Sequence, residues 1–241
     1  MRLFCAVFDT TKNRSYERMH RVWEYTAKKN SPCEAVDTLW IDPPKNTDPR
    51  RTSFDANYVK LKAWVDYCNK YPEEDIVLMD ADMMVMRPLQ EVFDRHKFDC
   101  AFTVRDQIGR LTINGGVVYV RGTAKAREIM DLWGVCDKKL YLNPKLHQTY
   151  RSKYAGMNQS SWGYMMEKHK PKGVLELPCS IYNKVVFLSK SKEKPYVIHL
   201  KDTLRQSALG GRHWNNCRYG TREYVKLWRQ FEKEATCELS V

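Results

Sequence analysis

The sequence predicts an α/β fold in which a mostly parallel β-sheet is flanked by helices. Short apolar runs alternate with segments of helical periodicity through the first half of the chain, which is the pattern of parallel strands joined by helices. The length of 241 residues suits a single domain. Hydrophobic residues make up 43% of the chain and aromatic residues 12%, enough for a sizeable core. A globally disordered chain is therefore excluded.

The individual elements follow from the length and spacing of the apolar runs. The predicted strands are residues 3–8, 36–41, 76–79, 100–104, 116–120, 174–177 and 196–200. Helices are predicted where apolar residues recur at intervals of three and four, over residues 16–26, 61–68 and 126–133. A final amphipathic helix is expected after Thr221, which can cap it. Two polar stretches, residues 46–53 and 137–156, are predicted to be loops.

Charge is distributed unevenly along the chain. The sequence holds 41 Lys and Arg residues against 29 Asp and Glu residues, a net charge of +12. Residues 1–137 carry 21 side chains of each sign, whereas residues 138–230 carry 19 basic and 5 acidic side chains, a net charge of +14. Such an excess indicates an anionic partner, which can be nucleic acid, a membrane surface or a phosphorylated small molecule.

The cysteines and the apolar runs give an expectation about the compartment. Eight cysteines are scattered without a C-x-x-C pair, which argues against a structural zinc site and against a compact disulfide framework. The longest apolar runs fall short of a membrane helix, and the first one is too short for a signal peptide. We therefore expect a cytoplasmic protein with free thiols.

The acidic residues Asp80 and Asp82 directly follow the apolar run 76–79. A strand that leads into two carboxylates places them at the carboxyl edge of the sheet, where open α/β sheets bind ligands. Carboxylate oxygens are ligands that Mg²⁺ and Mn²⁺ accept, and such a cation can neutralise a diphosphate. The alternative is a solvated turn after a strand, but the position favours a metal site.

Short motifs follow one another in a fixed order over about residues 1–205. They are Phe8-Asp9-Thr10, a helix with Lys60 and Trp64, Asp80-Ala81-Asp82, Met86-Arg87-Pro88-Leu89, Ile113-Asn114-Gly115-Gly116-Val117-Val118, Asn158-Gln159-Ser160, Leu177-Pro178, Tyr182-Asn183 and Val197-Ile198-His199. In this order they resemble the GT-A fold of nucleotide-sugar-dependent glycosyltransferases that carry a D-x-D metal motif. The resemblance implies transfer of a sugar to a hydroxyl group.

The resemblance also implies a metal site and a donor site. Asp80 and Asp82 would bind Mn²⁺ or Mg²⁺, with His199 as a third ligand, and the cation would bridge the diphosphate of a nucleotide sugar, for which a UDP-sugar is expected. Asp80 can instead face the ribose, and His199 can be an ordinary core residue. The residues implied to contact the donor are Asp9, Thr10, Lys60, Ala81, Asn114, Gly115, Gly116, Lys201 and Arg205. For Asn114 and Gly115 a tight hairpin is the alternative, and for Lys60 a solvated helix position.

Three further residues are candidates for the chemistry of transfer. An inverting enzyme needs a general base near the acceptor, and Asp106 and Asp202 are candidates for it. A retaining enzyme of the resembling fold commonly lacks such a base, and Gln159 then resembles a polar residue beneath the sugar. Some resembling families have a lysine six residues after the histidine, where this chain has Arg205, so either Lys201 or Arg205 can hold the departing diphosphate.

The basic residues 138–230 bear on the acceptor. The resemblance implies one domain over residues 1–241, with a donor-nucleotide half at 1–120, an acceptor half at 121–220 and a C-terminal helix and tail at 221–241. Because one diphosphate needs only one or two cations, we expect an anionic acceptor. Its predicted contacts are Arg151, Lys153, Trp162, Arg212, Trp214 and Arg218.

A hydroxymethylated DNA base is the favoured acceptor, because residues 150–154 and 211–219 mix cations with aromatic residues as nucleic-acid surfaces do. Such a base would have to be flipped into the site. A glycan, a protein or a lipid-linked sugar is the alternative. A non-catalytic basic nucleic-acid-binding domain would explain the charge but not the carboxylates, and a nucleotidyltransferase lacks support because no Gly-rich phosphate loop follows the first strand.

Overall fold

The computed structural model describes residues 1–8, 15–42, 49–105, 112–185, 193–210 and 221–238. Six residues predicted for the functional site lie outside these ranges, namely Asp9, Thr10, Asp106, Arg212, Trp214 and Arg218. For Asp202 and Thr203 the backbone is described but the side chains are not.

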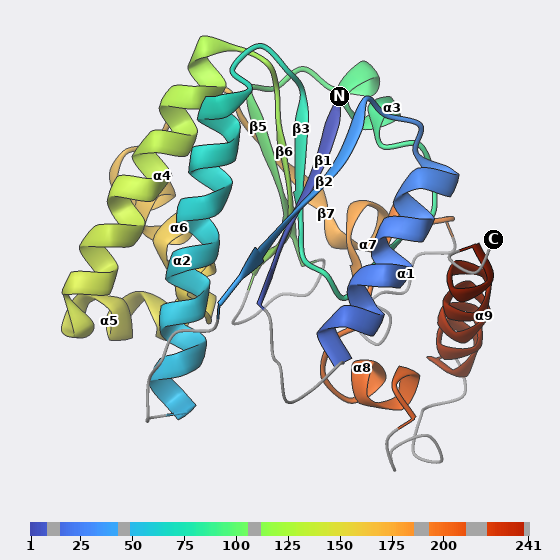
Figure 1. Cartoon of the computed structure of the whole chain (residues 1–241). Helices are drawn as coiled ribbons and strands as arrows, with labels where there is room; N and C mark the ends of the chain where they lie inside the picture. The colour runs from blue at the N-terminus through green and yellow to red at the C-terminus, as the bar shows by residue number, and fades with distance from the viewer. Residues whose placement is uncertain (9–14, 43–48, 106–111, 186–192, 211–220, 239–241) are drawn as a thin grey trace.

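A six-stranded sheet forms the centre of the structure (Figure 1). Its strands, in spatial order, are β2 (Ala35–Ile41), β1 (Arg2–Phe8), β3 (Ile76–Met79), β6 (Ile113–Val120), β5 (Cys100–Val104) and β7 (Val174–Pro178). β1 pairs in parallel with β2 and β3, and β5 pairs in parallel with β7, whereas β6 is antiparallel to β3 and β5. Five strands thus run one way and β6 runs the other, which confirms the mostly parallel sheet.

A second, smaller sheet lies at the carboxyl end of β3. It consists of β4 (Met83–Val85), β9 (Val197–His199) and β8 (Lys184–Val185), in the order β4-β9-β8. β4 begins directly after Asp82 and pairs antiparallel with β9, so that Met83 lies opposite His199. This pairing joins segments more than a hundred residues apart and positions the functional site.

Helices cover both faces of the large sheet (Figure 1). One face carries α2 (Pro49–Lys70), α4 (Ala124–Leu142), α5 (Pro144–Tyr154) and α6 (Met157–Lys168). The other carries α1 (Ser15–Asn30), and α9 (Arg222–Glu238) packs against the outer side of α1 and against α8 (Asp202–Ala208). α3 (Gln90–Arg95) and α7 (Cys179–Tyr182) are short connecting helices. None of the helices in the described ranges combines the length and the apolar composition that crossing a bilayer requires.

Both predicted loops contain helix. Pro49 begins α2, and the stretch 137–156 is the end of α4 followed by α5. The start of α5 is set by a helix cap that the polar composition of this stretch did not indicate. The Asn143 side chain accepts a hydrogen bond from the Leu146 amide, and Pro144 occupies the first turn of α5. The helices expose most of their side chains to solvent, so the stretch appears polar overall although His147 and Tyr150 are buried.

Trp162 corrects a prediction about the acceptor surface. Its side chain is 1% exposed, and its ring lies edge-on to Trp133 at 4.6 Å and tilted against Phe102 at 4.8 Å between ring centroids. These contacts place Trp162 in the core between the sheet and its helices. A side chain without accessible surface cannot contact a macromolecular acceptor, so Trp162 supports the fold instead.

A buried carboxyl group on α4 makes stability depend on pH. Burial raises the pKa of Asp137 to about 7, and the Ser161 hydroxyl and the Lys60 ammonium offset only part of this rise. Between about pH 4 and pH 7 the folded chain therefore binds more protons at this residue than the unfolded chain, so the contribution of Asp137 to stability falls as pH rises, by at most about 1.4 kcal/mol per pH unit.

We expect Asp137→Asn to remove this slope. Urea unfolding measured from pH 4 to pH 8 should give a difference in unfolding free energy between variant and parent that grows with pH, in favour of the variant by about 2–4 kcal/mol at pH 8. A difference that is constant across this range would show that Asp137 ionises normally in the folded protein.

Candidate metal and donor site

Three potential metal ligands meet where β3, β4 and β9 adjoin. Asp80 and Asp82 lie in the turn between β3 and β4, and His199 ends β9. The His199 Nε2 atom lies 3.2 Å from Asp82 Oδ1 and 3.9 Å from Asp80 Oδ2. One ligand atom from each of the three residues lies within 4.8 Å of the others. Asp82 and His199 are buried, so the group is held in place by packing.

A chain of buried hydrogen bonds sets which nitrogen of His199 carries its proton. The Thr103 hydroxyl donates to the Asn114 carbonyl at 2.7 Å, so its oxygen can accept from Asn183 Nδ2 at 2.9 Å. This orients the Asn183 amide with Oδ1 toward His199 Nδ1, at 3.1 Å. An amide oxygen only accepts hydrogen bonds, so the network assigns the proton to Nδ1 and leaves a lone pair on Nε2.

The lone pair on Nε2 faces carboxylate oxygens, which also only accept. At 3.2 Å two such atoms repel each other unless a proton or a metal cation lies between them. Burial and the charge of Lys201 lower the pKa of His199, against the opposite effect of Asp82 and Asp80, which disfavours the proton. The three residues therefore fit a divalent cation.

Gly116 makes room for the imidazole ring. A Cβ atom at this position of β6 would lie 2.8 Å from His199 Nδ1 and closer still to Cε1, nearer than real Cβ contacts reach. The side chain of His199 thus occupies the space that any larger residue would fill. The glycine that resembles part of a donor-sugar loop has a clear structural role in seating the imidazole of His199.

Two cations contact the carboxylates directly. Lys60 Nζ lies 2.7 Å from Asp80 Oδ1, and Arg205 Nη1 lies 3.1 Å from Asp82 Oδ2. Burial alone would raise the pKa of Asp82, but the positive charges around it, among them Arg205 and Lys201, outweigh burial and hold the pKa well below its usual range. Asp82 is therefore ionised across the physiological pH range, as a metal ligand must be.

Lys201 brings a further cation to the site. Its Nζ atom donates to Asn114 Oδ1 at 3.1 Å, and burial lowers its pKa. Asn114 thus joins the two parts of the site, since its backbone carbonyl ends the hydrogen-bond chain from His199 and its side chain holds Lys201.

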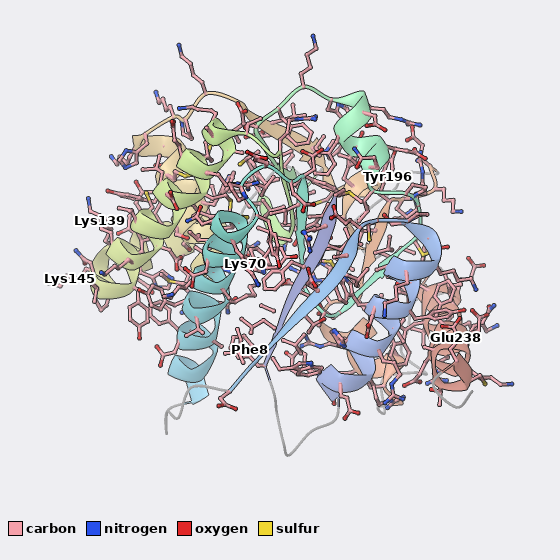
Figure 2. The ribbon with its side chains drawn as sticks, turned by 45° about the horizontal axis from the view of Figure 1, so that its top comes forward. Phe8, Lys70, Lys139, Lys145, Tyr196 and Glu238 are labelled. Atoms are coloured by element: carbon pink, nitrogen blue, oxygen red, sulfur yellow. The ribbon has the colours of Figure 1, made fainter. Side chains whose placement is uncertain are left out.

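A cavity of about 190 Å³ opens beside the carboxylates. It lies at the carboxyl end of β1, near Phe8 in Figure 2. Its lining residues are Ala6, Val7, Phe8, Tyr16, Ala56, Asn57, Lys60, Asp80, Ala81, Asp82 and Arg205. The lining thus combines apolar side chains with two carboxylates and two cations.

The sugar-loop prediction needs a correction. Asn114, Gly115 and Gly116 are part of β6, which begins at Ile113, so they form neither a loop nor a hairpin turn. The register of β5 with β6 shifts between Phe102 and Thr103, directly opposite this stretch. The irregularity turns the Thr103 hydroxyl toward the Asn114 carbonyl and so belongs to the construction of the site.

Gln159 lies next to the same stretch of β6. Its Nε2 atom donates to the Ile113 carbonyl, and its Cγ lies 3.3 Å from where a Cβ of Gly115 would stand. Arg151 and Lys153 are exposed on α5, and Lys153 pairs with Glu167 at 3.1 Å. The structure thus brings together Lys60, Asp80, Ala81, Asp82, Asn114, Gly115, Gly116, Gln159, His199, Lys201 and Arg205, and leaves Arg151, Lys153 and Trp162 outside this group.

Sequence reasoning missed three residues of the site. Asn183 appears in the sequence as one of the ordered landmarks, but nothing in one sequence links it to His199. Thr103 is an ordinary strand residue by pattern, and its role depends on the irregular register of β5. Tyr16, whose hydroxyl lies 3.5 Å from Arg205 Nη1, is one of several apolar positions on α1.

Comparison with known proteins gives matches in structure alone. No profile of a known protein family matches the chain, and no curated protein sequence matches it. A glycosyltransferase involved in glycosylation of the major capsid of PBCV-1 is similar, with a TM-score of 0.63 and 14% identity over 94% of this chain and 98% of the other. Mouse xyloside xylosyltransferase 1 gives a TM-score of 0.53 and 11% identity over 82% and 96%.

The galactosyltransferase LgtC, solved with donor and acceptor sugar analogues, gives a TM-score of 0.57 and 11% identity over 97% of this chain and 96% of the other. Each similarity extends over nearly the whole of both chains, apart from the 82% coverage of this chain by the mouse enzyme. At such low identities the likeness shows a common fold.

Proposed function

We propose that this chain, which has the GT-A fold of glycosyltransferases, is a metal-dependent enzyme that transfers a sugar from a nucleotide sugar to a hydroxyl group. The observation that supports this best is the cluster of Asp80, Asp82 and His199, in which Nε2 faces a carboxylate at 3.2 Å. It lies at the carboxyl edge of the sheet, beside a cavity with cations in its wall.

The residues of the site have two proposed roles in the transfer, which are to hold the cation and to neutralise the leaving diphosphate. When bound, the divalent cation supplies positive charge to the diphosphate as the bond to the sugar breaks. Asp80, Asp82 and His199 would hold it, and the Nδ1 proton of His199 on Asn183 keeps Nε2 directed inward. Lys60, Lys201 and Arg205 are the cations placed to neutralise the leaving diphosphate.

Gln159 is the catalytic candidate whose side chain the structure describes. Its Nε2 atom is tied to the Ile113 carbonyl, which fixes the amide beside Gly115. We propose that Gln159 lies beneath the transferred sugar. The assignments of Asp9, Thr10, Asp106 and Asp202, and the division of the chain at residues 120 and 220, stay predictions from the sequence.

The acceptor is proposed to carry negative charge, on the basis of the net +14 over residues 138–230. A hydroxymethylated DNA base is one acceptor of this kind, and an anionic glycan or a lipid-linked sugar is another. Binding to plain duplex DNA in a gel-shift assay at rising salt separates them, because a phosphate-binding surface loses affinity steeply as salt rises. Absence of a gel shift at low salt would rule out DNA as the acceptor.

Donor binding can be tested by thermal unfolding with a panel of nucleotide sugars and Mn²⁺. A donor at about 100 times its Kd stabilises the folded chain by about 2.7 kcal/mol, which for a chain of this size raises the Tm by about 5–10 °C. We expect this shift for a UDP-sugar with Mn²⁺ and a much smaller one with the metal chelated. A panel without any metal-dependent shift would contradict the proposed function.

A further inference from the structure

The C-terminal end of α4 and the start of α5 form an exposed basic corner with two apolar side chains. On α4, Val135, Lys138, Lys139 and Leu142 follow at intervals of three and four and so share one face. Val135 is 65% exposed and Leu142 is 69% exposed, unusual values for large apolar side chains. Lys145, also exposed, follows in the first turn of α5. These five residues define the α4–α5 corner.

The surface around the α4–α5 corner carries almost no negative charge from its own segment. Residues 132–166 hold five cations, and the one acidic residue among them, Asp137, is 1% exposed. Asp131, one turn before Val135 on α4, is exposed and accepts from Asn69 Nδ2 at 2.8 Å. On neighbouring helices, Asp55 accepts from the Tyr141 hydroxyl at 3.1 Å and Glu167 accepts from the Tyr154 hydroxyl at 2.8 Å, so both acidic groups are engaged. The α4–α5 corner therefore complements an anionic surface.

The rings that the lysines of this region approach, Tyr150 and Tyr164, are buried, and the half-buried Tyr141 and Tyr154 are already stacked on Tyr58 and Tyr150, which argues against nucleic acid. Lys139 Nζ lies 5.2 Å from the centre of the Tyr164 ring, and Lys153 Nζ lies 5.4 Å from that of Tyr150. Tyr150 and Tyr164 are 4% and 6% exposed and pack edge-on at 5.0 Å. Bases stack on exposed rings, and these rings offer no face to stack on. The exposed apolar groups here are aliphatic.

Aliphatic side chains between lysines suit the interface of an anionic membrane. There the aliphatic groups enter the boundary between headgroups and acyl chains, while lysine stems extend and their ammonium groups reach the phosphates. We propose that the α4–α5 corner docks this protein on an anionic lipid surface. Figure 2 shows Lys139 and Lys145 on the same side of the molecule, opposite Glu238 of α9.

The α4–α5 corner lies at the same end of the molecule as the metal ligands. β6 runs against β1 and β3, so α4 begins at the far end of the sheet and returns to the end where β1 and β3 finish, as Figure 1 shows. Leu142 is the last residue of α4. Docking at this corner therefore brings the end of the sheet that carries Asp80 and Asp82 toward the membrane.

The experiment is sedimentation of the full chain with vesicles of phosphatidylcholine, with and without phosphatidylserine. We expect binding only to the vesicles that contain phosphatidylserine, with release at high salt. Lys138→Gln combined with Lys145→Gln should weaken binding about 30-fold, since each lysine near an anionic surface contributes about 1 kcal/mol. Leu142→Ser should weaken it about tenfold through loss of apolar burial. Lys125→Gln, at the other end of α4, is the matched control and should bind like the parent.

Two results would overturn the proposal. One is failure of the parent to sediment with either kind of vesicle. The other is unchanged vesicle binding by Leu142→Ser together with retention of duplex DNA that depends on Lys138 and Lys145, which would assign the corner to nucleic acid. The assay needs neither donor nor Mn²⁺, so a negative result leaves the proposed transfer reaction standing, and Mn²⁺-dependent donor binding by the same samples tests that reaction separately.

Discussion

Asp82→Asn is expected to abolish Mn²⁺ binding. At a Mn²⁺ concentration that saturates the parent, the variant should bind the donor about a thousandfold more weakly or worse, equivalent to about 4 kcal/mol. Asp82 is 7% exposed and lies between His199 Nε2 and Arg205 Nη1, at 3.2 and 3.1 Å. An amide of the same size keeps the packing but removes the charge that the cation needs. The measurements are electron paramagnetic resonance of free Mn²⁺ and calorimetry of UDP binding with Mn²⁺ present.

The control for Asp82→Asn is Asp94→Asn, the same change at an exposed position on α3. It should leave both measurements unchanged. Circular dichroism and thermal unfolding establish that Asp82→Asn is folded. A folded Asp82→Asn variant that still binds Mn²⁺ as the parent does would place the metal elsewhere and would remove the main support for the proposed function.

Asn183→Leu is expected to weaken Mn²⁺ binding by about 10- to 100-fold, the range found when the hydrogen-bond partner of a ligating histidine is removed. Asn183 is fully buried and accepts from His199 Nδ1 at 3.1 Å. Leucine has a similar volume but offers no acceptor, so His199 can rotate or carry its proton on Nε2. Either change removes the lone pair that a metal needs.

Asn183→Asp distinguishes a positioning role from simple packing. A carboxylate at this position still accepts from His199 Nδ1, although it can no longer donate to Thr103, so Mn²⁺ affinity should stay within a few-fold of the parent. The nitrogen shifts of His199 in the metal-free protein report its tautomer, with Nδ1 protonated in the parent and in Asn183→Asp. Equal loss of Mn²⁺ affinity in the leucine and aspartate variants would show that Asn183 only fills space.

The order of strands and helices was predictable because it depends on local pattern. The runs 76–79 and 100–104 are the strands β3 and β5 with identical limits, since continuous apolar residues pair in the interior of a sheet wherever they occur. The predictions that failed were the two loops, because their polar composition was interpreted as a lack of secondary structure. α5 exposes most of its side chains and depends on the Asn143 cap, so its composition resembles that of a loop.

The metal site could be predicted in part for the same reason. The strand before Asp80 and Asp82 determines their position at the edge of the sheet, and this strand can be recognised from its local sequence. The involvement of His199, Lys60 and Arg205 was an expectation from the order of motifs, and it stays a prediction, although all three residues contact the two carboxylates. Trp162 shows the limit, because a tryptophan in a basic stretch can lie in the core or on the surface and sequence pattern does not distinguish the two.

The sequence by itself determined the class of fold, the edge of the sheet where the carboxylates lie and the concentration of positive charge after residue 137. Tertiary structure decided the rest, because the decisive contacts join residues far apart in the chain. The pairing of β4 with β9 brings His199 to Asp82, and Thr103, at the register shift between β5 and β6, meets Asn183 from a later segment of the chain. Directing the Nε2 lone pair of His199 at a carboxylate requires atomic positions accurate to about a few tenths of an ångström, and only the packing of the folded chain fixes positions to that accuracy.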